Sequence, residues 1–147
     1  MIAKAPPRLP GWVSLASRLI IWLQARGISF LSFHVLAIPG RKSGRMLKTV
    51  VSPFGVDGRR YVLSFGELQW VRNARQAGWG ILGRGRRNDR VTLVEIEPPT
   101  SGRIARQFPR EVPAGVRFFT DLGLVSRPGG PDEFEAAAER LTLFRVD

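Results

Sequence analysis

The sequence predicts a mainly β fold with flanking helices, a small closed barrel formed by a single domain. The chain has 147 residues, of which 44% are hydrophobic and 24% charged. These values are typical of one globular domain with its own core. Short β-branched and aromatic runs are separated by turn signals, as in antiparallel barrels. Helical patterns occur only at the start, in the middle and near the end, so regular crossovers between parallel strands are not indicated.

The barrel is expected over about 33–147, after two N-terminal segments. Residues 1–10 are rich in proline and basic groups and predict a flexible arm. Residues 12–26 have apolar side chains at helical spacing, including Trp12 and Trp22, and therefore predict an amphipathic helix. Arg18 interrupts its apolar run, which is too short to span a bilayer, and no signal-peptide pattern is expected. The helix packs either on the barrel or on a membrane surface.

The first half of the barrel is expected to contain three strands and a helix. Pro39-Gly40 is a turn signal, and Asp57-Gly58 predicts a tight hairpin of type I′. The helix is expected to stop at Gly78. The expected elements are strands Phe33–Ile38, Met46–Phe54 and Arg60–Phe65, and a helix at Glu67–Ala77.

The second half is expected to contain a strand pair, an irregular stretch, a helix and a closing strand. Three prolines leave residues 100–130 without a readable pattern. The last helix is expected to start at Pro131, with Asp132 as N-cap and Glu135 three residues on. Its acidic side chains form a solvated face or, alternatively, a dimer contact. The expected strands are Trp79–Gly83 and Val91–Ile96, joined by the basic segment Arg84–Arg90, and Leu141–Val146, which makes five or six strands in all.

Composition excludes several kinds of chemistry. The chain has no cysteine and a single histidine, His34, which excludes disulfides, thiol nucleophiles and histidine metal clusters. The absence of cysteine also fits a reducing compartment. Twenty-three basic residues against twelve acidic ones give a net charge of +11. This charge favours a negative partner, which is nucleic acid, anionic lipid or a polyanionic small molecule.

Two short stretches have residue types suited to ligand binding. In the turn at 40–45, glycines allow close backbone approach, Arg41, Lys42 and Arg45 bring positive charge, and Ser43 brings a hydroxyl. These groups suit a phosphate or carboxylate, although an ordinary basic hairpin turn has the same composition. The spacing is neither a P-loop nor a dinucleotide fingerprint.

The second stretch joins a strand end to the central helix. Gly66 allows close approach of a ligand, Trp70 offers an aromatic face, and Asn73 offers both a donor and an acceptor. The alternative interpretation is that Trp70 anchors the core and Arg72 is solvated.

Taken in order, the two motifs and the strands around them resemble the F(420)-dependent deazaflavin reductases, also described as the nitroreductase or quinone-reductase family, over about Val35–Ile96. The resemblance implies a split β-barrel of the type that also binds flavin mononucleotide. It implies a cytoplasmic homodimer, in some members attached to the inner face of the plasma membrane. It further implies that coenzyme F(420) is bound, with its phosphate and acidic tail at the turn and its ring along the second stretch. The cofactor-binding residues are then Arg41, Lys42, Ser43, Gly44, Arg45, Lys48, Ser64, Phe65, Gly66, Trp70 and Asn73.

Three positions depart from the family pattern. Leu47 stands where the family often has arginine, and Val50 where a proline is common. Phe65 stands where some members have lysine. Lys48 is adjacent to Leu47 but points to the other side of a strand, so Arg45 is the residue expected to compensate.

The resemblance implies hydride transfer from the reduced deazaflavin to a small organic acceptor such as a quinone, a nitroaromatic or an activated alkene. The cofactor supplies that chemistry, so no side chain is assigned a catalytic role and no metal is expected. The alternatives are a split barrel that binds flavin mononucleotide or lipid without catalysis, and a basic nucleic-acid-binding module. Nucleic acid is disfavoured because the aromatic residues do not form an exposed stacking array.

Overall fold

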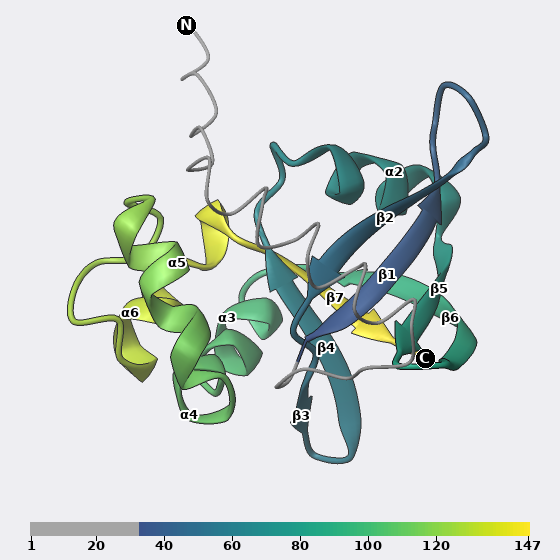
Figure 1. Ribbon diagram of the computed structural model, residues 1–147. Helices are drawn as coiled ribbons and strands as arrows, with labels where there is room; N and C mark the ends of the chain where they lie inside the picture. Colours follow the sequence, from purple (N-terminus) through teal and green to yellow (C-terminus); the bar gives the residue numbers. More distant parts are fainter. Residues whose placement is uncertain (1–32) are drawn as a thin grey trace, which may run out of the picture.

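The computed structural model describes residues 33–147, so the predicted arm and N-terminal helix lie outside the described residues. Figure 1 shows one curled sheet, with α2 across one end and the helices from α3 to α6 gathered on the side away from the β1–β2 hairpin. The strands are β1 (His34–Pro39), β2 (Met46–Val51), β3 (Phe54–Val56), β4 (Arg59–Ser64), β5 (Trp79–Arg84), β6 (Arg87–Ile96) and β7 (Thr142–Val146). The α-helices are α2 (Gln69–Ala77), α3 (Thr100–Ala105), α4 (Phe108–Glu111), α5 (Val116–Asp121) and α6 (Pro131–Ala136). Two short 3₁₀ turns are η1 (Pro113–Gly115) and η2 (Ala138–Arg140).

The seven strands of the described residues follow the order β2-β1-β5-β6-β7-β4-β3, and neighbouring strands are antiparallel. β6 is the longest strand and pairs with β5 over Arg87–Thr92 and with β7 over Leu93–Ile96, so it belongs to both halves of the sheet. Within the described residues, β2 and β3 are separate edges. The barrel is therefore split, as the resemblance implied, and not closed as the turn pattern alone predicted.

Each face of the sheet packs against its own core. On one face, strand residues such as Leu36 and Val62 pack with Val71 and Ala74 of α2. On the other face, the helices from α3 to α6 enclose an aromatic cluster in which Phe108, Phe119 and Phe134 are buried. Each ring of this cluster lies 5.3–5.7 Å from the next, centroid to centroid.

The turn signals at glycine are confirmed. Asp57 and Gly58 have φ of 51° and 77°, the two positive values that a type I′ hairpin needs, and they join β3 to β4. Gly78 ends α2 in the left-handed conformation, with φ 73°, and its N–H donates to the carbonyl of Ala74 at 2.8 Å. These two turns direct the chain into β4 and β5.

Two expected elements have different boundaries. The predicted strand Met46–Phe54 is two strands, since β2 pairs with β1 and β3 pairs with β4. Pro53 lies at the break and has no N–H for a ladder. The basic segment Arg84–Arg90 is a tight hairpin and not a linker, because β5 runs to Arg84 and β6 begins at Arg87.

The stretch without a readable pattern, residues 100–130, contains α3, α4 and α5, none longer than six residues. Such pieces are too short to show helical periodicity. The predicted N-cap of the last helix is wrong. α6 is capped at Gly130, whose N–H donates to the Glu133 carboxylate at 3.0 Å. Among the described helices, none is long and apolar enough to cross a membrane.

We predict that Gly78→Ala destabilises the protein by about 1–2 kcal/mol, because an added Cβ disfavours the left-handed conformation. No atom lies within 4 Å of that Cβ position, so the cost is conformational and not steric. Urea unfolding measures the effect. The control is Gly55→Ala, where φ is not in the left-handed region and the nearest atom to the added Cβ is 3.9 Å away. Equal losses in the two variants would contradict this account of the α2 stop.

Candidate functional site

The basic turn between β1 and β2 is held by its own backbone. The N–H of Gly40 donates to the carbonyl of Arg45, and the N–H of Gly44 donates to the carbonyl of Gly40, both at 2.8 Å. Gly44 has φ 73°. A Cβ on Gly40 would lie 3.1 Å from both Leu47 Cδ1 and Ser43 Oγ. Glycine is therefore needed at Gly44 for its left-handed backbone conformation, and at Gly40 for the close packing of neighbouring side chains.

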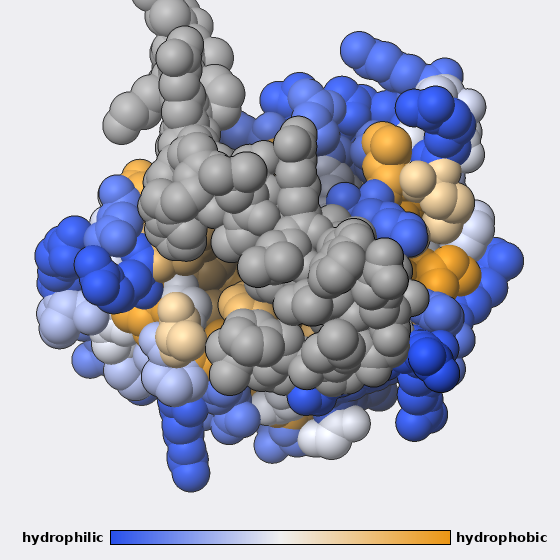
Figure 2. Space-filling view, in the orientation of Figure 1, coloured by the Kyte–Doolittle hydropathy of each residue, from blue (hydrophilic) through white to orange (hydrophobic). Residues whose placement is uncertain are grey.

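The turn presents unused donors to solvent. Lys42, Ser43, Gly44 and Arg45 are exposed, and Figure 2 shows hydrophilic residues over the tip of this hairpin. The Ser43 hydroxyl accepts the Arg45 N–H at 3.3 Å, which leaves its own proton free to donate. In the described part of the chain, the backbone N–H groups of Lys42 and Ser43 donate to no acceptor. Two free N–H groups, a hydroxyl and two cations form a donor set that fits a phosphate or carboxylate.

Asn73 fixes this turn to α2. Its Oδ1 accepts two hydrogen bonds from Arg41, from the backbone N–H at 3.2 Å and from Nη1 at 2.8 Å. Asn73 is only 3% exposed, so it is a buried anchor and does not present its amide to a ligand. The structure thus brings together Arg41 and Asn73, which lie 32 residues apart and in different predicted motifs.

The second motif is placed differently from the expectation in two respects. Phe65 is 0% exposed as a whole residue and packs against Phe118, with ring centroids 6.2 Å apart, so neither its side chain nor its backbone is accessible to a ligand. Ser64 is also buried. A Cβ on Gly66 would lie 3.2 Å from Nη1 of Arg75. The close approach that this glycine permits is therefore already made by the Arg75 guanidinium.

Arg75 and Glu95 were not among the predicted site residues. The guanidinium donates to both carboxylate oxygens of Glu95, at 2.8 and 2.9 Å, and Nη2 also donates to Thr142 Oγ1 at 3.3 Å. The hydrogen bond to Glu95, reinforced by nearby carboxylates against partial desolvation, raises the pKa of Arg75 further above its ordinary value. No sequence spacing links these partners, because they meet only after α2 packs against β6 and β7.

The remaining predicted residues lie around these two places. Trp70 is half-buried and packs on Phe144, with centroids 5.9 Å apart, so it is a core anchor with one partly exposed side. Leu47 pairs with Ile38 and lies on the α2 face of the sheet, close to Gly40. Lys48 pairs with Ala37 and therefore faces the opposite side. Lys48 therefore does not lie on the face of the sheet that carries Asn73 and α2.

Neither place is a metal site. In residues 33–147, no group of three or more acidic, histidine or cysteine side chains is arranged to hold a metal ion. The two places lie at different parts of α2, Asn73 with the basic turn and Arg75 with Gly66. A cavity of about 530 Å³ adjoins Gly66 and Arg75. The basic turn does not line it.

No family model matches the chain, and no curated protein matches it. Solved structures do match. A conserved hypothetical protein from Mycobacterium tuberculosis superposes with a TM-score of 0.52 at 12% identity, covering 100% of this chain and 85% of that one. An F(420)-H2 dependent reductase gives 0.48 at 16% identity, with coverage of 82% and 99%. A pyridoxamine 5′-phosphate oxidase-related, FMN binding protein from Nostoc punctiforme gives 0.49 at 15%, with coverage of 95% and 82%.

The first of these likenesses supports the split-barrel fold. At these identities the likeness establishes a fold and not an activity.

We predict that Asn73→Ala releases the basic turn, since both hydrogen bonds from Arg41 lose their acceptor. The cost expected for leaving these donors unpaired is about 1–3 kcal/mol, and the Arg41 amide should exchange with solvent markedly faster. Hydrogen exchange followed by mass spectrometry measures this. Asn73→Asp keeps an oxygen acceptor and is the matched control, which should retain most of the protection. If the Arg41 amide exchanges equally fast in the natural protein and in Asn73→Ala, the anchor is not Asn73.

Proposed function

We propose that the protein binds coenzyme F(420) and reduces a small organic acceptor with it. The observation that carries the proposal is the exposed donor set of the basic turn, held on one face of a split barrel by the part-buried hydrogen bonds between Arg41 and Asn73. Its donors fit the negatively charged phosphate and tail of the coenzyme. The resemblance to F(420)-dependent reductases supports the same assignment.

In this proposal the chain's residues bind and orient, and none is a nucleophile. Lys42, Ser43 and Arg45 hold the anionic part of the coenzyme. Gly66, the one residue of 64–66 that is not buried, would lie beside its ring, with the buried Phe65 behind it. When bound in reduced form, the deazaflavin supplies a hydride.

Binding of flavin mononucleotide is the second candidate, and one observation favours it. Leu47, near Gly40, gives no charge at the position where the resemblance expects a third cation. The turn is then suited to a single phosphate more than to a phosphate with a long acidic tail. The titration below includes both cofactors for this reason.

Three further features of the proposal come from the resemblance, and the amphipathic pattern of residues 12–26 also supports the last of them. These are the homodimer, the cytoplasmic location and attachment of residues 12–26 to the inner face of the plasma membrane.

Nucleic acid stays a rival ligand because of Arg84, Arg86 and Arg87, although Arg87 pairs with Asp89 at 3.4 Å. A fourth basic residue, Arg90, stacks 4.2 Å from the centroid of the Trp79 ring.

The first experiment is a calorimetric titration of the purified full chain with oxidised F(420) and, in parallel, with flavin mononucleotide. We expect micromolar binding of the deazaflavin. Lys42→Ala and Arg45→Ala should each weaken it by about tenfold or more, since hydrogen bonds to charged groups contribute about 1.5–3 kcal/mol. Arg110→Ala, which removes an exposed cation from α4, is the matched control and should leave the affinity unchanged.

Each contrary result would be informative. Binding of flavin mononucleotide alone would move the function to the second candidate. Absence of binding by either cofactor, with salt-sensitive binding of an RNA or DNA oligonucleotide, would replace the proposal with the nucleic-acid alternative.

A further inference from the structure

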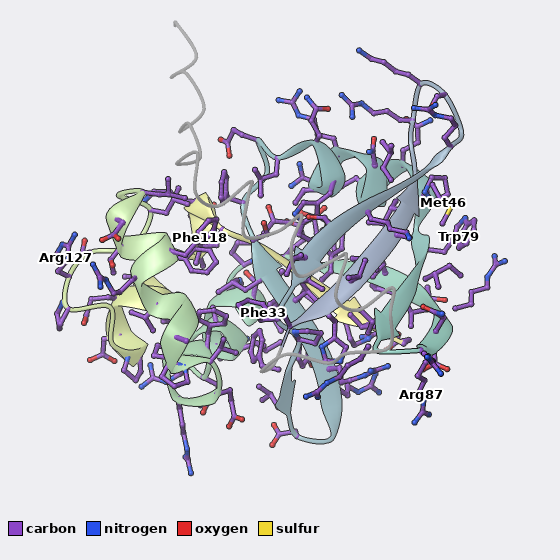
Figure 3. The ribbon with its side chains drawn as sticks, viewed as in Figure 1. Phe33, Met46, Trp79, Arg87, Phe118 and Arg127 are labelled. Carbon is purple, nitrogen blue, oxygen red and sulfur yellow. The ribbon has the colours of Figure 1, made fainter. Side chains whose placement is uncertain are left out.

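The cavity beside Gly66 has the size of a small-molecule pocket. Its volume is about 530 Å³, within the range of about 300–1,000 Å³ that such pockets occupy. It lies where the end of β6 and the start of β7 meet the loop before α2 and two segments of the helical part, 122–124 and 138–141. Figure 3 shows Phe118, which packs against Phe65, on the side of the barrel away from Met46 and Trp79.

Part of the cavity wall is apolar. Ile96, Leu124 and Leu141 line it while packing against the aromatic core behind them, and Leu122 lines it without belonging to that core. Side chains of this kind suit a flat ring or a short apolar body. The wall therefore favours an organic molecule over a bare ion.

Arg75, which lines the cavity, is not available to bind an anion. Its guanidinium donates to both oxygens of Glu95 and to the Thr142 hydroxyl, and it rests on the Gly66 backbone. The Arg75–Glu95 pair is neutral as a whole. It closes one side of the cavity without giving it a net charge.

The other charged groups around the cavity are mostly acidic. Apart from Arg75 and Glu95, the charged residues that line the cavity are Glu67, Glu97, Glu139 and Arg140. They bring three carboxylates and one guanidinium. Glu67 and Glu97 line the cavity together with Arg75, and their negative charges help to raise the pKa of Arg75. With Glu95, four of the chain's twelve acidic residues line this one cavity in a protein of net charge +11.

We propose that this cavity receives the organic acceptor and that Glu67, Glu97 and Glu139 select uncharged and cationic ring compounds over anionic ones. The identification of the ligand as the acceptor rests on the proposed function. Selection by charge does not, because it follows from the cavity alone. Gly66 connects the proposed coenzyme site with the cavity, since it lies at the end of the proposed ring-binding segment and also lines the cavity.

The test uses the full chain without coenzyme and three probes that share one ring system: N-methylquinolinium, quinoline and quinoline carboxylate. They are titrated separately at mildly alkaline pH, where quinoline is uncharged, and binding is followed by protein NMR. We expect the cation and the neutral ring to bind and the anion to bind at least about tenfold more weakly, the factor that 1.4 kcal/mol represents.

The variant Glu97→Gln with Glu139→Gln should bring the affinities for the cation and the neutral ring close together, with that for neutral quinoline nearly unchanged. Glu111→Gln, on α4 and outside the cavity, is the control and should keep the natural preference. Leu122→Trp should fill the cavity and weaken all three probes, and its urea midpoint shows whether it still folds.

Two outcomes would overturn the selectivity: failure of quinoline and its cation to bind the folded protein, or an anion that binds as tightly as the cation. The acceptor role has its own readout. With reduced F(420), the ratio of kcat/KM for naphthoquinone over naphthoquinone sulfonate should fall in the double glutamine variant, and an unchanged ratio would overturn that role. Probe discrimination without any coenzyme binding would keep the selective cavity and refute the proposed function.

Discussion

The two hydrogen bonds from Arg41 to Asn73 Oδ1 are the constraint on which the candidate site depends. A hairpin tip of six residues would otherwise be tied to the barrel only through the two strands that it joins. Because Asn73 is buried in a helix that packs on the same face of the sheet, the tip gains a third attachment. A turn held at three points keeps its free N–H groups in one arrangement before a ligand arrives, which reduces the entropy lost on binding.

The same helix also places the second site. Asn73 and Arg75 are two residues apart, which puts them roughly 200° apart around the helix axis. Asn73 can therefore reach the β1–β2 turn while Arg75 reaches Gly66 and the β6 and β7 strands. Val71 and Ala74 between and beside them are buried in the sheet core. The packing of one nine-residue helix thus sets the separation of a basic turn and an acidic cavity.

Much of the fold was predictable because local chemistry decides it. Asp57-Gly58 and Gly78 need positive φ and have it, and the antiparallel strands follow from the turns between them. The prediction of one continuous strand across Pro53 was wrong. Hydrophobic residues occur on both sides of this position, but β2 before it pairs with β1 and β3 after it pairs with β4. The helices within residues 100–130 were not predicted, because a helix of four to six residues has too few turns to show a periodic pattern.

The predicted site residues stay a prediction, but the structure shows where each of them lies and which partners it contacts. Gly-Arg-Lys-Ser-Gly predicted a turn at which the backbone can approach a ligand, although an ordinary basic hairpin turn has the same composition. Asn73 was expected to meet a ligand and instead holds Arg41, and the room at Gly66 is used by Arg75. Both roles depend on partners from distant parts of the chain. Glu95 is in an ordinary strand pattern, and only the fold reveals that it neutralises Arg75.

Net charge was the most conspicuous property of the sequence and says little about the cavity. Exposed charges more than about 8–10 Å apart are largely screened at physiological salt, so each site responds to its own neighbours. We therefore expect the basic turn and the three carboxylates, which belong to different places in the fold, to act separately. A ligand with an anionic tail and an uncharged ring can then bind in one direction only. Reversal would place its tail among Glu67, Glu97 and Glu139 and leave the cations of the turn without a partner.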